Sequence, residues 1–241
     1  MTCASVVIPA HGHAGMTENC VRAIVTDPLF PDDAEVIVVD DCSPEPLALP
    51  SASDSRVRVL RTPTNLMFAG ACNFGAAHAT GQYVVFVNND TEASPGWLKA
   101  MLDVAEDERD TAVVGARLLY HDGTVQHAGV AFSQRDGVPR HVYRGFPGDH
   151  RVVLRDRDFA AVTGACLLIE AGIFEELGGF DTAFVNGYED IDLCLRVRQT
   201  GRTVRYCGIA ELRHYESVSR RGEIEGLEPD ADPNLSLFMS R

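Results

Sequence analysis

Unbroken apolar runs predict three buried strands in the first ninety residues of the chain. The runs occupy residues 5–8, 35–39 and 83–87, and valine dominates them. A strand that is buried on both faces, as in a parallel sheet, has such a continuous run, whereas a half-exposed strand alternates apolar and polar residues. A shorter run at residues 57–60 predicts a fourth strand.

Helices are predicted between these strands. Residues 16–26 and the alanine-rich residues 69–80, which Gly81 closes, have helical composition and a helical end signal. Strand and helix therefore alternate, which is typical of an α/β fold with a mostly parallel central sheet flanked by helices.

The second half of the chain has a mixed pattern. It predicts, in order, a helix at 95–108, a strand at 112–119, a strand at 160–170 and a short helix at 173–177. Residues 120–158 are rich in Gly, Arg and His, so we expect hairpins and loops that form a small subregion over one face. The end of the chain, residues 223–241, is expected to be a loosely docked tail.

Polar residues follow each of the three buried runs. The first run leads into Pro9, Ala10 and His11, the second into Asp41, and the third into residues 88–90, Asn-Asn-Asp. Ligands of open α/β sheets bind beyond the carboxyl ends of the strands, so we expect these residues on one rim. Each of them singly is also an ordinary turn residue or helix breaker.

Three carboxylates, Glu189, Asp190 and Asp192, open an amphipathic helix. The helix macrodipole alone can explain carboxylates at this position. Residues at i and i+2 do not share a helix face, so Asp190 and Asp192 cannot serve one substrate group. We expect Asp192 to cap the helix or to pair with Arg196 at i+4.

The acidic composition narrows the classes of partner. The net charge is −14, from 35 acidic and 21 basic residues, which disfavours nucleic acid as a partner. A divalent metal can still mediate between acidic side chains and a diphosphate. Apolar runs are too short to span a bilayer and no signal segment is evident, so we expect a cytoplasmic protein. The seven scattered cysteines are expected to be mostly core residues in a reducing compartment.

Short motifs occur in a fixed order along the chain: Val6 to His11, Val38 to Ser43, Asn65 to Gly75, Tyr83 to Thr91, Thr163 to Cys166, Gly178 to Asp181, Gly187 to Arg196 and His214 to Ser217. In this order they resemble the inverting glycosyltransferases of family 2, which have the GT-A fold. The resemblance is greatest to the bacterial branch that builds rhamnose-containing and other cell-surface polysaccharides. It implies a catalytic domain over residues 1–221, with a nucleotide-sugar half to about 118 and an acceptor half from about 119, and a tail at 222–241.

The resemblance also implies a reaction and a partner for each half. A sugar moves with inversion from a nucleoside diphosphate sugar, of the UDP or dTDP type, to a hydroxyl of a saccharide or lipid-linked saccharide. Contact with a membrane would be peripheral. Such a transfer needs a base for the acceptor proton and a cation for the departing diphosphate.

Residue roles follow from the matching motifs. Asp190 is implied to be the base, with Glu189 orienting it or the acceptor, and Asp90 to bind Mn²⁺ or Mg²⁺ with His214. Imidazole weakly favours Mn²⁺. Asp41 is implied to accept the N3–H of uracil or thymine. The implied donor-binding residues are Pro9, Ala10, His11, Asp41, Gly70, Asn73, Asn88 and Asn89.

Other interpretations of these residues stay open. Gly70 is equally a helix-start glycine, Asn73 a polar helix residue and His214 a polar turn residue. Asn88 and Asn89 replace carboxylates of the family motif, which favours as an alternative a non-catalytic module that binds nucleotide sugar or polysaccharide. A nucleotidyltransferase would need a Gly-rich basic loop near the N-terminus, which the sequence lacks.

Overall fold

A computed structural model describes residues 3–107, 110–215 and 233–241, and its centre is one ten-stranded sheet. The strand order is β10-β12-β6-β11-β4-β1-β2-β3, with β5 paired to β12 and β7 to β6, while β8 and β9 form a separate hairpin. The strands are β1 (Ala4–Ala10), β2 (Glu35–Asp40), β3 (Val57–Arg61), β4 (Tyr83–Val87), β5 (Thr91–Ala93), β6 (Thr111–Leu119), β7 (Val125–His127), β8 (Val130–Phe132), β9 (Pro139–His141), β10 (Arg157–Asp158), β11 (Cys166–Glu170) and β12 (Thr203–His214).

The four strands predicted from the first ninety residues form a parallel unit. β1 pairs in parallel with both β2 and β4, and β2 pairs in parallel with β3. All residues of β4 and nearly all of β1 and β2 are buried, as their unbroken apolar runs predict. The α/β fold with a mostly parallel sheet is therefore confirmed for this half.

The other half of the sheet mixes strand directions. β11 lies antiparallel between β4 and β6, and the long β12 runs parallel to β6. The sequence pattern did not predict β12. Its pairing with β6 is broken by a register shift between Cys207 and Glu211, and this irregularity interrupts the alternation that would have marked a strand. Residues 120–158 form the expected hairpins and loops.

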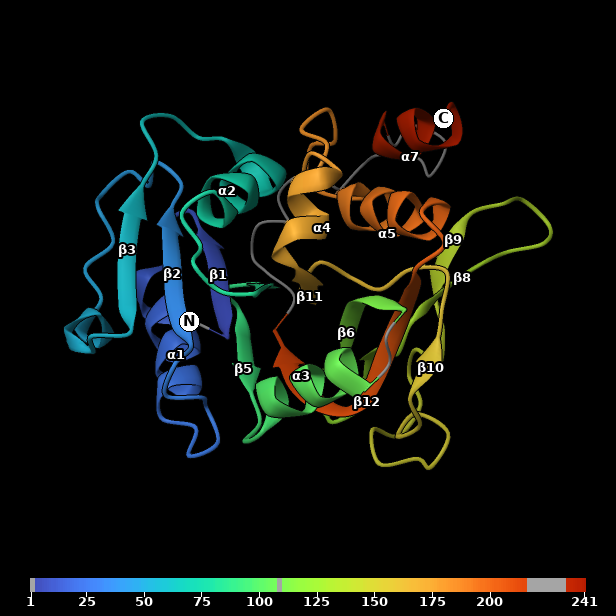
Figure 1. The fold of residues 1–241 in the computed structure, drawn as a ribbon, viewed down its shortest axis with the longest axis horizontal. Helices are drawn as coiled ribbons and strands as arrows, with labels where there is room; N and C mark the ends of the chain where they lie inside the picture. Colours follow the sequence, from blue (N-terminus) through green and yellow to red (C-terminus); the bar gives the residue numbers. More distant parts are fainter. Residues whose placement is uncertain (1–2, 108–109, 216–232) are drawn as a thin grey trace.

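Helices cover both faces of the sheet (Figure 1). One core joins the sheet to α1 and α3, and the other joins it to α2, α4 and α5. The helices are α1 (Ala14–Val25), α2 (Met67–Ala76), α3 (Trp97–Asp107), α4 (Ala171–Glu176), α5 (Glu189–Gln199), α7 (Pro233–Met239) and the short 3-10 helix η1 (Pro50–Ser53). Within the described ranges, none of these helices is long and apolar enough to cross a bilayer.

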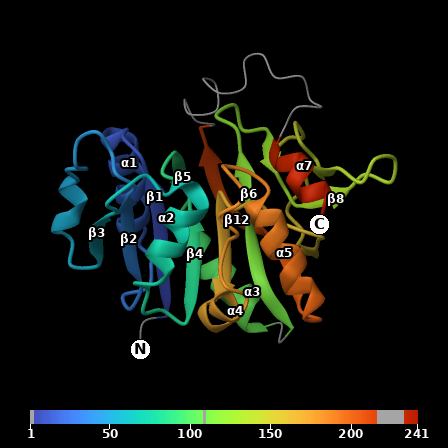
Figure 2. The same cartoon turned by 90° about the horizontal axis from the view of Figure 1, so that it is seen from above.

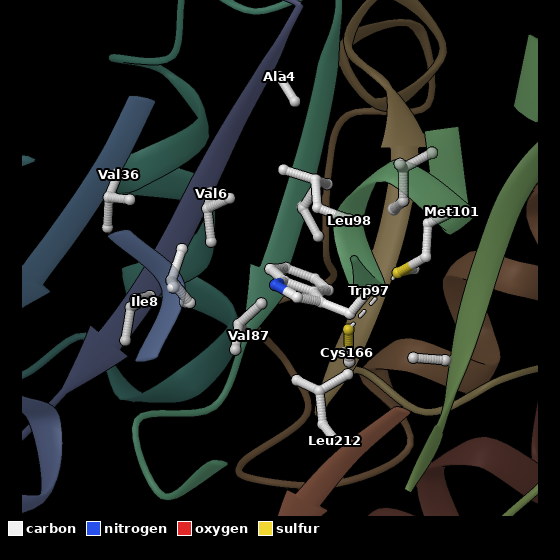
Figure 3. Packing of buried hydrophobic residues seen from close by; sticks show 14 of the residues in the cluster. Ala4, Val6, Ile8, Val36, Val87, Trp97, Leu98, Met101, Cys166 and Leu212 are labelled. Carbon is white, nitrogen blue, oxygen red and sulfur yellow. Dashed lines mark hydrogen bonds between the residues drawn. The ribbon is translucent and has the colours of Figure 1, made fainter. Parts of the chain in front are cut away.

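Trp97 at the start of α3 fills the first of these cores (Figure 3). It is 1% exposed, and Cys166 of β11 lies next to it with its thiol 3.8 Å from the sulfur of Met101. Cys166 is one of five fully buried free cysteines, which confirms that most thiols of this chain are core residues. The first part of the predicted tail, up to residue 232, lies outside the described residues, and its last part forms α7.

Candidate active site

The strand register brings the predicted polar residues to one rim of the sheet. Ala10 at the end of β1 lies opposite Asp40 at the end of β2, and Val7 lies opposite Phe86 of β4. The residues that follow these strands therefore start side by side. Pro9 and Ala10 are the last residues of β1, and His11 begins the loop beyond it.

Asp41 is held at this rim by hydrogen bonds. It is 4% exposed, and its Oδ1 accepts hydrogen bonds from the hydroxyl of Thr62 (2.9 Å) and the amide of Leu66 (2.8 Å). The ring Nδ1 of His11 donates to the carbonyl of Asp41 (2.8 Å), so the loops after β1 and β2 are joined. A carboxylate fixed in this way presents an acceptor group in a defined direction at the strand ends.

Asp40, which precedes it, has a structural role. Its carboxylate accepts hydrogen bonds from the amides of Ser43 (3.0 Å) and Leu47 (3.1 Å). It also forms an ion pair with Arg61 (2.6 Å). Burial by itself raises the pKa of Asp40, but these hydrogen bonds lower it below its ordinary value. The loop after β2 therefore folds around an ionised Asp40.

Asp90 and His214 form a second polar centre, joined by long-range strand pairing. His214 of β12 lies opposite Thr91 of β5, which places its Nε2 at 3.1 Å from Oδ1 of Asp90 and 3.3 Å from Nδ2 of Asn88. The other ring nitrogen, Nδ1, donates to Oε1 of Gln126 (2.6 Å). This hydrogen bond fixes the ring orientation, with Nε2 as the ring atom that faces the Asp90 carboxylate.

These residues fit a divalent cation. An imidazole nitrogen next to a carboxylate oxygen is a metal-ligand arrangement, and a hydrogen bond on the other ring nitrogen is the usual support of such a ligand. Oδ2 of Asp90 and Oδ1 of Asn88 are both buried without a hydrogen-bond partner, which a cation would supply. In the described residues no three His, Cys, Asp or Glu side chains cluster together, so other ligands would have to come from substrate and water.

Asp190 and Glu189 lie in the first turn of α5 and differ in their surroundings. Glu189 is 5% exposed and its Oε2 accepts the amide of Gly187 (2.6 Å). Asp190 is half-buried, and its Oδ2 accepts the amide of Gly164 (2.7 Å). Asp192 pairs with Arg196 at 2.8 Å, which confirms its predicted structural role. Asp190 is thus the more accessible of the two site carboxylates.

The segment 163–165 connects Asp190 to the Asp90 centre. The amide of Gly164 binds Asp190, while the carbonyl of Ala165 accepts the amide of Asn88 (3.0 Å). A Cβ atom on Gly164 would lie 3.2 Å from that of Asp190, so glycine permits this close approach. Adjacent residues therefore hold the candidate base and the candidate metal centre.

Two residues at this centre, Gln126 and His127, were not predicted from the sequence. His127 is fully buried, and its Nε2 accepts the amides of Gly129 (3.2 Å) and Thr163 (3.4 Å) while its Nδ1 faces His141 (2.7 Å). Burial holds the pKa of His127 well below its ordinary value, so the ring is neutral. Both residues belong to β7, a strand too short to leave a periodic signal.

Left-handed backbone conformations are frequent in the turns of this region. The residues with positive φ that are not glycine include His13, Cys42, Met67, Asn186 and Tyr188. Such conformations cost about 1–3 kcal/mol each and concentrate at ligand sites, where the surrounding structure fixes them. All five residues are close in sequence to the strand-end loops or to the start of α2 or α5.

Contacts within the protein account for three of the predicted donor-binding residues. Both polar atoms of the Asn73 side chain bond to the backbone of Phe180. Asn89 donates to the Thr17 hydroxyl (3.0 Å), and a Cβ on Gly70 would lie 2.8 Å from that of Leu66. Their contact with a donor stays a prediction.

Comparison of the sequence with known proteins finds a matching family and several relatives. The family described as Glycosyl transferase family 2 matches residues 5–178. The chain is 37% identical over 91% of its length to uncharacterized protein y4gI of Sinorhizobium fredii, of which it covers 25%. It is 31% identical over 98% of its length to O-antigen biosynthesis protein RfbC of Myxococcus xanthus, of which it covers 19%. The chain thus spans a quarter or less of these relatives.

A solved structure shares the fold. The crystal structure of GalNAc-T7 with UDP, GalNAc and Mn²⁺ matches 89% of this chain with a TM-score of 0.70, and the chain covers 44% of it. The sequences are 18% identical, so the likeness shows the GT-A type of fold alone.

Proposed function

Because the chain belongs to glycosyl transferase family 2, we propose that it transfers a sugar, with inversion, from a uridine or thymidine diphosphate sugar to a hydroxyl of a saccharide acceptor. The observation that carries this proposal is the link through residues 163–165 between the Asp90–His214 centre and Asp190. The Asp90–His214 centre suits the departing diphosphate, and Asp190 suits the acceptor hydroxyl. The name of the Myxococcus relative supports a role in cell-surface polysaccharide synthesis.

Asp190 is proposed to act as the base. Its carboxylate takes the proton of the acceptor hydroxyl while the hydroxyl oxygen attacks the anomeric carbon, and the bond from that carbon to the nucleoside diphosphate breaks. The amide of Gly164 fixes the carboxylate in place, and buried Glu189 shapes the turn before it. We also propose that the acceptor hydroxyl belongs to a saccharide or a lipid-linked saccharide. The chain spans a quarter or less of its relatives, so their names alone do not assign this acceptor.

The donor would lie along the strand ends. Asp41 accepts the N3–H of uracil or thymine, a donor that cytosine lacks, and Pro9, Ala10 and His11 flank the base and ribose. Asp90, His214 and Asn88 would hold a divalent cation, which neutralises charge on the diphosphate when it is bound. The Mn²⁺ in the GalNAc-T7 structure supports manganese as the first candidate.

A second candidate function is a binding module that holds nucleotide sugar or polysaccharide without turnover. Asn88 and Asn89 favour it, because they supply no carboxylate beside Asp90. A module of this kind would bind the donor tightly without metal and would not hydrolyse it.

Nucleotide binding is tested first by thermal shift with Mn²⁺. UDP or dTDP species should raise the melting temperature, whereas GDP and ADP should not. Asp90→Asn should weaken Mn²⁺ binding measured by electron paramagnetic resonance, because a charged ligand of the cation is lost. A shift with GDP but not with UDP would contradict the role of Asp41.

Turnover is tested with the donor that binds. Asp190→Asn should lower kcat by at least about 100-fold with donor affinity retained, because only the base is removed. Asp103→Asn is the control: it removes the same charge from an exposed helix carboxylate, one that pairs with Lys99. Full turnover of Asp190→Asn at saturating donor would refute the assignment.

A further inference from the structure

The helix α7 binds the loop that leads into the candidate base. Val185 of this loop donates its amide to Oδ1 of Asn234 (3.1 Å), and Nδ2 of Asn234 donates to the carbonyl of Val185 (2.7 Å). The amide side chain therefore pairs with both backbone groups of one residue, as a neighbouring strand would. Such pairing fixes the position and the direction of the loop backbone.

An aromatic contact adds a second attachment. The ring of Phe238 in α7 lies 5.5 Å from that of Tyr188, the residue immediately before α5, and 6.2 Å from that of Phe132 in β8. Figures 1 and 2 show α7 beside α5 and the β8–β9 hairpin. Phe238 thus joins the start of α5 to a separate part of the fold.

Charge provides the third attachment. Arg241 forms an ion pair with Asp181 at the beginning of the loop and lies 3.7 Å from the carboxylate of Asp192 in α5. Its guanidinium also lies over the ring of Phe184, at 5.1 Å from the centroid. Both ends of the loop and its middle therefore contact residues 233–241.

The loop needs such support because its backbone is strained. Asn186 and Tyr188 have φ of 59° and 72°, and Tyr188 caps α5 without a side-chain hydrogen bond to the helix. Val185 is 53% exposed, so burial of its own side chain does little to hold it. Strained residues persist where their surroundings determine their conformation, and α7 supplies part of these surroundings.

We propose that α7 is a positioning element for Asp190. Asn234, Phe238 and Arg241 fix residues 181–188 and thereby the direction in which α5 presents Asp190 to the acceptor hydroxyl. The role of Asp190 rests on the function proposed above, whereas the attachment of the loop does not. These residues act through the loop, so they are positioning residues and not catalytic ones.

The test uses the full chain with Asn234→Ala and Phe238→Ala. Hydrogen exchange followed by mass spectrometry should show amides of residues 181–192 exchanging roughly tenfold faster or more, because the attachments that hold the loop are lost. With the donor that binds, kcat should fall on the order of 10- to 100-fold, as expected for a displaced catalytic group. The KM for the donor should change less than kcat, because neither variant removes a hydrogen bond of Asp41, whose carboxylate is held by Thr62 and Leu66.

Two further variants separate positioning from general destabilisation. Phe238→Tyr keeps the ring and should restore both the exchange rate and kcat. Met239→Ala is the matched control on the same helix, because Met239 is 51% exposed and lies near Gly137 instead of the loop. It should behave like the wild type.

Each outcome decides the proposal. Unchanged exchange of residues 181–192 in both alanine variants would overturn it, and so would faster exchange with unchanged kcat. If the wild type turns over no donor, the proposed function fails. The exchange rates then still decide whether α7 holds the loop.

Discussion

Replacing Asn73 by alanine should destabilise the protein, because its side chain is bonded to the backbone of Phe180. Nδ2 donates to the Phe180 carbonyl at 2.8 Å, and the Phe180 amide donates to Oδ1 at 2.9 Å. Phe180 is 2% exposed, so water replaces these partners poorly. The substitution leaves both backbone groups unpaired while the loop before residue 180 stays attached to α5 through Arg196.

The size of the effect follows from these two bonds. Each buried polar group that loses its partner costs about 1–3 kcal/mol, so the loss of both lowers the free energy of unfolding by about 2–6 kcal/mol. For a domain of this size 1 kcal/mol corresponds to about 2–4 °C, so the melting temperature should fall by roughly 4–24 °C. Asn73→Asp keeps the acceptor for the Phe180 amide but turns a second oxygen toward the Phe180 carbonyl, so it should not restore the wild-type stability.

Urea unfolding and thermal melts measure this loss, with donor binding by calorimetry as the second readout. Asn19→Ala, at an exposed position of α1, serves as the control and should change the free energy of unfolding by at most about 0.5 kcal/mol. A wild-type melting temperature for Asn73→Ala together with lost donor affinity would refute the reasoning. Asn73 would then be a donor ligand, as its sequence motif implies.

Two further predictions concern the loop after β2. Hydrogen bonds hold the pKa of Asp40 below its ordinary value, so the stabilisation by this carboxylate is present above the ordinary pKa and is lost as the pH falls through the lowered pKa. Urea unfolding at pH 7, 5 and 3 should show the deficit of Asp40→Asn shrinking at the lowest pH; a constant deficit would contradict this. Cys42, half-buried beside Asp41, should be the first thiol alkylated by iodoacetamide, because burial raises the pKa of Cys3 to about 11 and the other five thiols are buried. UDP with Mn²⁺ should slow the alkylation of Cys42. If the protein binds UDP but Cys42 is alkylated at an unchanged rate, the nucleotide does not lie beside Asp41.

Sequence pattern alone predicts the parallel half of the fold and the rim on which the candidate site lies. Short unbroken apolar runs rich in valine favour strands covered on both faces, and the carboxyl ends of parallel strands lie at the same edge of a sheet. The same local reasoning paired Asp192 with Arg196, because four residues make one helix turn. The family motifs pointed to Asp90 and His214 as a pair before their contact was known.

Contacts between segments far apart in the sequence follow only from the packing of the folded chain. His214 reaches Asn88, 126 positions earlier, only because β12 pairs with β5, and no periodicity in the sequence encodes that pairing. Gln126 enters the same centre from β7, and α7 reaches the loop before Asp190. Hydrophobic periodicity reports which face of an element is buried, but not which element buries it. The partners of each site residue were therefore set by packing across the sheet.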